Sequence, residues 1–190
     1  MKNTFLLLLA LSLVFASCNK DDDTAEEVND SQFSYDGAAQ DAPALEEGTY
    51  DLGARFPASL TDNFEGKQLE EVSFYILTVP SKCELLVFGE GTDSEPGSLL
   101  YTANLTTSID GESWNKHVLT TPVDITGEDL WICVRVEHVA TMGSLGCDTG
   151  PANSNGDWMF VGSTNEWTTL RNFSDNVVNI NWNIRGKVSE

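Results

Sequence analysis

The clearest pattern in the chain is the alternation of apolar and polar residues from Val178 to Val188. Every even-numbered position in this stretch except Gly186 is apolar, and every odd-numbered position is polar. A period of two places successive side chains on opposite faces of a β-strand. The pattern therefore predicts a strand with one face on a hydrophobic core and the other in solvent. Trp182 falls on the apolar face, so we predict that it lies in the core.

The rest of the chain also reads as short strands. Leu130 to Val139 alternates in the same way. Six further candidate strands are Val72–Val79, Cys83–Gly89, Leu99–Leu105, Lys116–Ile125, Trp158–Gly162 and Trp167–Leu170. Segments rich in Gly, Asp and Asn separate them, and a helical pattern is confined to a short turn near Ala58–Asn63. We therefore predict an all-β fold, an antiparallel jelly-roll β-sandwich of about eight strands, over residues 33–190.

The first residues carry the features of a secretory signal peptide. Lys2 is positively charged, an apolar run follows from Phe5 to Phe15, and two small residues precede Cys18. The run is shorter than the roughly 20 residues with which a helix crosses a bilayer. The sequence Phe-Ala-Ser-Cys resembles the lipobox of bacterial lipoproteins, in which the cysteine is acylated. We predict a signal peptide at 1–17 and a membrane anchor at Cys18; an ordinary cleaved signal with a chance cysteine is the alternative.

Residues 18–32 are predicted to form an acidic, flexible tether. They contain almost no large apolar side chains, and Asp21, Asp22 and Asp23 lie close behind the cysteine. The acidic run resembles the signal that sends some Gram-negative lipoproteins to the outer surface. We therefore expect a lipid-anchored protein of the outer membrane that is exposed at the cell surface. A solvated acidic linker without an address is the alternative.

The charge of the chain excludes some classes of partner. Ten Lys and Arg against 30 Asp and Glu give a formal net charge of −20. Nucleic acid is excluded, because its phosphates must be neutralised by Lys and Arg. Adsorption on anionic lipid is disfavoured for the same reason. The global charge favours cationic ions or partners.

Several short motifs follow one another along residues 33–190. They are Ala54-Arg55-Phe56-Pro57, Gly66-Lys67, Val72-Ser73-Phe74-Tyr75, Val87-Phe88-Gly89, Trp114-Asn115, Pro122-Val123, Leu130-Trp131-Ile132, Asp148-Thr149-Gly150-Pro151 and Asn181-Trp182-Asn183-Ile184-Arg185-Gly186. In this order they resemble the cleaved-adhesin domain of gingipain-type haemagglutinins. The resemblance implies a jelly-roll sandwich, often with structural calcium, that binds host proteins or glycans and is not catalytic. Members typically occur as repeats in large precursors, whereas this chain carries one copy.

The residues do not outline an active site. The two histidines, His117 and His138, lie near or within predicted strands. The chain has no G-x-S-x-G, H-E-x-x-H or P-loop motif. Neighbouring carboxylates such as Glu70 and Glu71 do not indicate a glycosidase, whose two carboxylates flank a sugar. We predict that the protein is not an enzyme and keep a glycan-active enzyme as an alternative.

Calcium is the metal that the sequence favours, because it binds six to eight oxygen ligands that acidic and amide-rich loops supply. The loop from Cys147 to Asp157 is rich in such side chains, and Asp36 lies at the start of the domain. The predicted ligands of a structural calcium ion are Asp36, Asp148, Asn153, Asn155 and Asp157. A turn rich in Asp and Asn, without an ion, is the alternative.

Three cysteines remain after Cys18, namely Cys83, Cys133 and Cys147. An odd number allows at most one internal disulfide. Cys83 and Cys133 lie in apolar strands, where free cysteine behaves as a small hydrophobe. We expect them to be reduced and buried.

Tryptophans near loops are the candidate ligand contacts. Trp114, Trp158 and Trp167 lie beside predicted loops, where an exposed indole can stack on a sugar ring or anchor a protein. Each can equally be packed, because tryptophan is largely buried on average. Trp131 is out of phase with Ile132 and therefore faces outward or into a second layer.

Three functions remain open. The first is a surface module that binds a host or dietary glycan or protein. The second is a structural subunit of a larger outer-membrane complex, which an exposed apolar patch would favour. The third is a glycan-active enzyme, which requires a cleft with a carboxylate of raised pKa. We favour the first.

Overall fold

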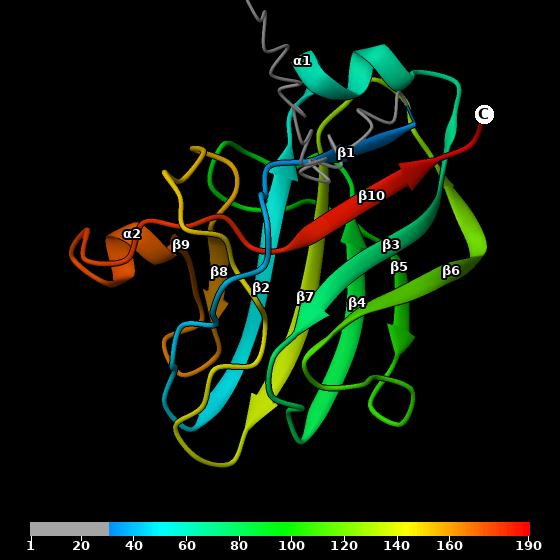
Figure 1. Ribbon diagram of the computed structural model, residues 1–190. Helices are drawn as coiled ribbons and strands as arrows, with labels where there is room; N and C mark the ends of the chain where they lie inside the picture. Colours follow the sequence, from blue (N-terminus) through cyan, green and yellow to red (C-terminus); the bar gives the residue numbers. More distant parts are fainter. Residues whose placement is uncertain (1–30) are drawn as a thin grey trace, which may run out of the picture.

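The computed structural model describes residues 31–190, and these form two antiparallel β-sheets (Figure 1). The strands are β1 (Gln32–Ser34), β2 (Gly48–Phe56), β3 (Gln68–Ile76), β4 (Lys82–Phe88), β5 (Leu99–Asn104), β6 (Ser113–Asp124), β7 (Leu130–His138), β8 (Trp158–Val161), β9 (Glu166–Thr169) and β10 (Ile184–Val188). The helices are single turns: α1 (Ala58–Thr61), η1 (Asp62–Phe64) and α2 (Leu170–Phe173). The predictions for the signal peptide, Cys18 and nearly all of the tether fall outside the described residues.

The strands follow a jelly-roll path. One sheet has the order β1-β10-β3-β6 and the other the order β5-β4-β7-β2-β8-β9. The chain crosses from one sheet to the other at each step from β1 to β4, and β5 then follows β4 in the six-stranded sheet. It crosses to the four-stranded sheet for β6, returns for β7, β8 and β9, and crosses again for β10. The hairpin β8–β9 extends the six-stranded sheet beyond β2 and forms one of its edges. The predicted all-β sandwich is confirmed.

Two strands and one boundary differ from the prediction. β1 and β2 were not expected, and β1 starts at Gln32, inside the predicted tether. The alternating stretch at the C-terminus becomes a strand only from Ile184. Before it, Asn181 and Asn183 are buried although they lie on the polar side of the pattern. The prediction that this face is in solvent is therefore wrong there.

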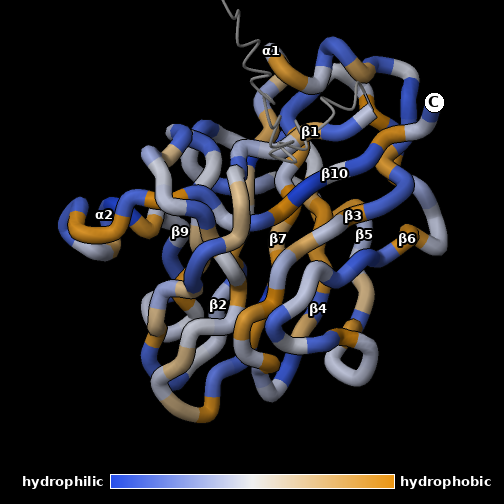
Figure 2. Tube along the Cα trace, viewed as in Figure 1, coloured by the Kyte–Doolittle hydropathy of each residue, from blue (hydrophilic) through white to orange (hydrophobic). Residues whose placement is uncertain are grey.

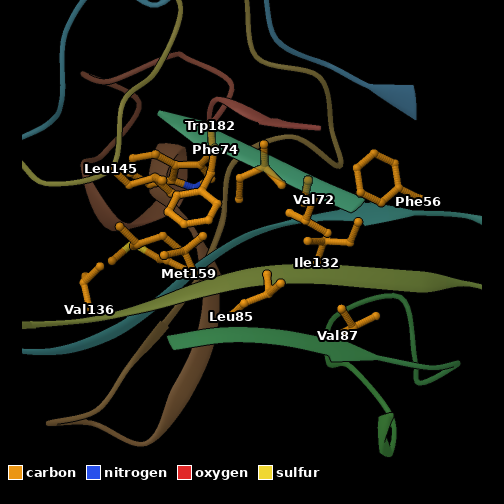
Figure 3. Close-up of a cluster of buried hydrophobic side chains, with 14 of the residues drawn as sticks. Phe56, Val72, Phe74, Leu85, Val87, Ile132, Val136, Leu145, Met159 and Trp182 are labelled. Atoms are coloured by element: carbon orange, nitrogen blue, oxygen red, sulfur yellow. The ribbon is translucent and has the colours of Figure 1, made fainter. Parts of the chain in front are cut away.

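The core lies between the sheets. Figure 3 shows side chains from both sheets facing one another, including Phe74 from β3, Leu85 from β4 and Ile132 from β7. Trp182 is 1% exposed, as predicted, and its indole N–H donates to the Trp158 carbonyl at 3.0 Å. β7, which lies mid-sheet, carries mainly hydrophobic colours in Figure 2. Central strands buried on both faces read as continuous apolar runs.

The three cysteines of the described part are buried free thiols, as expected. Burial raises the pKa of Cys83 and of Cys147 to about 12. Their thiolates are therefore scarce at neutral pH, and the side chains act as apolar packing. Within residues 31–190, no helix is long and apolar enough to span a membrane.

Candidate functional site

The outer face of the four-stranded sheet carries a polar pocket around Trp114. It has a volume of about 270 Å³ and is lined by Gln32, Glu71, Ser73, Trp114, Lys116, Arg185 and Lys187. We call it the Trp114 pocket. Its residues come from all four strands of this sheet, β1, β10, β3 and β6.

Strand register places these side chains side by side. Ser73 of β3 is opposite Arg185 of β10 on one side and Lys116 of β6 on the other. Glu71 is likewise opposite Lys187. Because side chains alternate across a strand, these residues share the outer face, while their neighbours Val72 and Phe74 point into the core.

Trp114 is half-buried and held from two sides. The guanidinium carbon of Arg185 lies 4.3 Å from the centroid of the indole ring. The ring of Tyr75, which is opposite Trp114 in the ladder, makes an edge contact at 5.9 Å between centroids. A cation over an indole face is an attractive arrangement. Trp114 is thereby fixed in one orientation at the rim of the pocket.

Arg185 is itself fixed from below by Asp36. The Asp36 side chain is 0% exposed and accepts from Arg185 Nε at 3.0 Å. Asn183 Nδ2 donates to the same carboxylate at 2.9 Å. Burial raises the pKa of Asp36, and the hydrogen bonds of Asn183 and Arg185 oppose this rise. The chain from Asp36 through Arg185 to Trp114 pre-organises the pocket, so little ordering remains for a ligand to induce.

Lys116 and Lys187 have no carboxylate within ion-pair distance among residues 31–190. Every arginine, by contrast, pairs with an aspartate: Arg55 with Asp129, Arg135 with Asp51, Arg171 with Asp157 and Arg185 with Asp36. Lys82 pairs with Glu84 at 3.1 Å. Both free lysines are exposed and line the Trp114 pocket. The pocket thus offers an indole, several N–H donors and ammonium groups to a ligand.

A larger cleft of about 490 Å³ opens near the β4–β5 and β6–β7 loops. Its lining includes the buried residues Val123 and Leu130 and the exposed residues Glu90 and Glu128. Its lining contains no aromatic side chain and no Lys or Arg. The Trp114 pocket is smaller, but its lining includes an aromatic ring and three cationic side chains.

The other two predicted tryptophan contacts lie on the opposite side of the molecule, on the six-stranded sheet. Trp158 is only 9% exposed and packs on Trp131 with 5.2 Å between ring centroids. The prediction that Trp158 is an exposed contact is therefore wrong. Trp167 is half-buried and covers Trp131 at 5.8 Å. Trp131 does face away from the core, but this aromatic layer leaves it 0% exposed.

The aromatic layer shows that the six-stranded sheet curls. Trp167 of β9 and Phe88 of β4 lie 6.5 Å apart between ring centroids. Four inter-strand steps separate these strands, which on a flat sheet would amount to about 19 Å. The hairpin β8–β9 therefore folds back over the outer face, and its tryptophans act as a second, smaller core.

The predicted calcium ligands are engaged by protein donors. Asp157 is 0% exposed and accepts from Arg171 Nε and Nη2, each at 2.8 Å. Asp148 accepts from the backbone N–H groups of Gly37, Gly150 and Asn181 and from Asn181 Nδ2. These hydrogen bonds lower the pKa of Asp148 and outweigh the opposing effect of burial.

Two of the five predicted ligands are thus bound to guanidinium groups, Asp157 to Arg171 and Asp36 to Arg185. Asn153 Oδ1 accepts a hydrogen bond from the backbone N–H of Asn155. The backbone carbonyl of Asn155 in turn accepts one from the backbone N–H of Arg55. No group of three or more His, Cys, Asp or Glu side chains within residues 31–190 is arranged to hold a metal ion. A calcium shell made of these five residues does not fit their contacts, and a structural calcium ion stays a prediction of the sequence.

The two histidines lie in separate environments. His138 is 2% exposed, and its Nε2 is 2.7 Å from the hydroxyl of Ser144, which is 1% exposed. His117 Nε2 is 2.7 Å from the hydroxyl of Tyr101. Burial lowers the pKa of both imidazoles. The serine beside His138 is enclosed by protein, so this pair offers no nucleophile to a substrate.

The sequence singled out Trp114, which lines the pocket, as a candidate contact but not the residues around it. Arg185 and Lys187 lie on the polar side of the predicted C-terminal strand, which was a usable signal. Lys116 and Gln32 come from strands that are distant in sequence, and only the strand order brings them to the same face.

No protein-family model matches the chain, and no curated protein matches it. Among solved structures, it is similar to the clostridial cysteine protease Cwp84 after propeptide cleavage. That match has a TM-score of 0.59 and 13% identity, and covers 85% of this chain and 41% of that chain. A second is the cysteine protease and lectin-like domains of Cwp84, a surface layer associated protein of Clostridium difficile. It has a TM-score of 0.55 and 13% identity, covering 77% of this chain and 33% of that chain. This chain spans less than half of either structure, and the likeness shows the fold alone.

Proposed function

We propose that this protein is a non-catalytic carbohydrate-binding module that is held at the cell surface by a lipid on Cys18 and binds glycans in the Trp114 pocket. The observation that carries the proposal is the fixed indole of Trp114 among the N–H donors of Arg185, Lys116 and Lys187. A sugar ring has an apolar C–H face and a rim of hydroxyls. The indole of Trp114, one face of which is covered by Arg185, offers apolar contact beside polar donors and so suits both parts of it.

The fold supports a binding role. Cwp84 combines a cysteine protease with lectin-like domains, and the all-β sandwich of this chain corresponds in architecture to the lectin-like part. Sandwiches host many functions, so the pocket is the main support for a binding role, and the fold is compatible with it. Among the described residues, the buried His138–Ser144 pair is the closest approach to a catalytic arrangement, and it lacks access for a substrate.

The surface location rests on the sequence. The lipobox-like Phe-Ala-Ser-Cys and the following acidic run are the support for an anchor at Cys18 and for exposure at the outer membrane. A flexible acidic tether would leave the sandwich free to approach extracellular glycans. Replacing Cys18 by Ser is expected to release the protein from the membrane fraction, and unchanged retention would contradict the anchor.

The proposal is tested by purifying the full chain in detergent and measuring its binding to an array of host and plant glycans. The informative variants are Trp114→Ala and Trp167→Ala, because each removes a half-buried indole, but from opposite faces. We expect Trp114→Ala to weaken binding about tenfold or more, and Trp167→Ala to leave it within about twofold.

The reverse pattern would move the site to the six-stranded sheet. Absence of binding to any glycan by the folded wild-type protein would overturn the carbohydrate proposal. Circular dichroism of each variant confirms that a loss of binding is not a loss of folding.

A further inference from the structure

We infer that the glycan bound in the Trp114 pocket is acidic, and that Lys116 and Lys187 receive its carboxylate or sulfate group. This inference rests on the proposed function, because it names the ligand class of the same pocket. It also runs against the expectation from the global charge of −20, which favours cationic partners.

The distribution of cations is the first argument. Lys2 and Lys20 precede the described residues, and five of the remaining Lys and Arg residues pair with carboxylates. Of the three lysines without an ion pair within residues 31–190, two line this one pocket. In a chain with 30 acidic residues, carboxylates to pair with are abundant, so the unpaired state of both lysines in one place is a specific feature of the pocket.

The local charge balance is the second argument. The pocket holds three cations, Lys116, Arg185 and Lys187, and one anion, Glu71. Asp36 lies beneath and offsets Arg185. Glu71 lies one strand from Lys187, with its Oε1 3.5 Å from the Ser73 hydroxyl, and offsets one lysine. One positive charge is left over, which suits a ligand with one anionic group per sugar ring.

The arrangement of the strands is the third argument. Lys116 and Lys187 lie on β6 and β10, on either side of β3, in adjacent rows of the ladder. Neighbouring strands are about 4.8 Å apart and alternate residues of one strand about 6.8 Å apart, so the backbones of the two lysines are about 12 Å from each other across Ser73 and Glu71. The long lysine side chains can therefore approach one bound sugar from two sides. Trp114 lies one row farther along β6, where it can contact the ring.

The experiment compares matched pairs of polysaccharides that differ only in charge. We would use polygalacturonate against its methyl ester, and chondroitin sulfate against desulfated and carboxyl-esterified chondroitin, with the full chain in detergent. The acidic member of at least one pair is expected to bind about fivefold or more tightly at about 50 mM NaCl. The difference should shrink at about 500 mM, because exposed charges are screened by salt.

Variants separate the lysines from the indole. The double substitution of Lys116→Gln with Lys187→Gln should remove the preference for the acidic member and keep the weaker binding of the neutral one. Lys67→Gln, which removes an unpaired lysine outside the pocket, should change neither. Trp114→Ala should weaken both members alike.

The outcomes distinguish the two proposals. Equal binding of charged and neutral members, or binding of neutral glycans alone, would overturn the inference and leave the carbohydrate proposal standing. A preference for acidic members that survives the double lysine substitution would also overturn it. If no carbohydrate binds the folded protein, the proposed function fails and the inference fails with it.

Discussion

The guanidinium of Arg171 binds the fully buried carboxylate of Asp157 in a bidentate manner, through two hydrogen bonds of 2.8 Å each. Arg171 Nη2 also donates to the Asn153 carbonyl at 3.2 Å, and its backbone N–H donates to the same Asp157 carboxylate. The pair therefore joins α2 to the loop that precedes β8. A paired, hydrogen-bonded carboxylate tolerates burial, whereas an unpaired one does not.

Replacing Arg171 by Gln is expected to lower the free energy of unfolding by about 3 kcal/mol, because the substitution leaves the Asp157 charge buried without a cation. Urea unfolding followed by tryptophan fluorescence measures the change. Lys82→Gln is the matched control, since it removes an ion pair whose lysine is 42% exposed. Exposed pairs contribute about 0–1 kcal/mol. Equal effects of the two substitutions would contradict this account of Asp157.

The apolar pattern predicted a strand well where apolar residues occupy the core-facing positions along its whole length. β3, β4 and β7 have apolar residues on the core face, and the sequence located each of them. β2 was missed although it lies in the middle of its sheet. It carries Asp51 and Gly53, which disfavour a central strand in isolation. Contacts with the neighbouring strand β7 explain why both residues occur there: Asp51 is paired with Arg135, and Gly53 lies against Cys133.

The site was predictable only in part, for a related reason. Local sequence indicates that a tryptophan is near a loop, but the sheet order decides which face it occupies and what covers it. Trp158 and Trp114 look alike in sequence, yet the curl of the β8–β9 hairpin buries one and the four-stranded sheet displays the other. The acidic loop at 147–157 resembled a calcium site because most of the donors that bind its carboxylates lie elsewhere in the chain: Arg171 binds Asp157, and Gly37 and Asn181 bind Asp148.

Gly53 tests the packing between β2 and β7. A Cβ added there would collide with Cys133 Sγ and with the Ile132 carbonyl. We expect Gly53→Ala to destabilise the protein by about 2–3 kcal/mol, in the range of overpacked cores. Adding Cys133→Ala should recover part of this loss, because it removes the sulfur but leaves the carbonyl. Thermal melts of the single and double variants give the coupling, and strictly additive losses would show that the sulfur contact is not the cause.

Calcium is expected to have little effect on folding stability, because the carboxylates of Asp36, Asp148 and Asp157 already accept hydrogen bonds from protein donors. Differential scanning calorimetry with EDTA and then with millimolar CaCl₂ measures this. Melting temperatures should agree within about 2 °C. A clear rise with calcium but not with magnesium would support the structural calcium ion that the sequence predicts, and Asp148→Asn would then locate it.

The buried imidazole of His138 should make stability depend on pH in a defined window. Burial lowers its pKa in the folded protein, whereas the unfolded chain takes up a proton near the ordinary value of about 6.5. Below about pH 6.5 the unfolded state therefore binds more protons than the folded state, and stability falls as the pH falls further. The ring faces the Ser144 hydroxyl at 2.7 Å from Nε2, the ring of Tyr50 at 5.6 Å between centroids, and the backbone of Leu45 and Glu46. The hydrogen bonds of this backbone oppose the lowering of the pKa, but burial has the larger effect.

Melting temperatures from about pH 8 to about pH 5 test this linkage. His117, whose pKa burial also lowers, contributes in the same direction, so wild type should lose stability steadily below about pH 6.5. His138→Gln can keep a hydrogen bond to Ser144 but cannot titrate. It should flatten the slope in this window while lowering stability at pH 8 only modestly, and an unchanged slope would mean that other groups set the pH response.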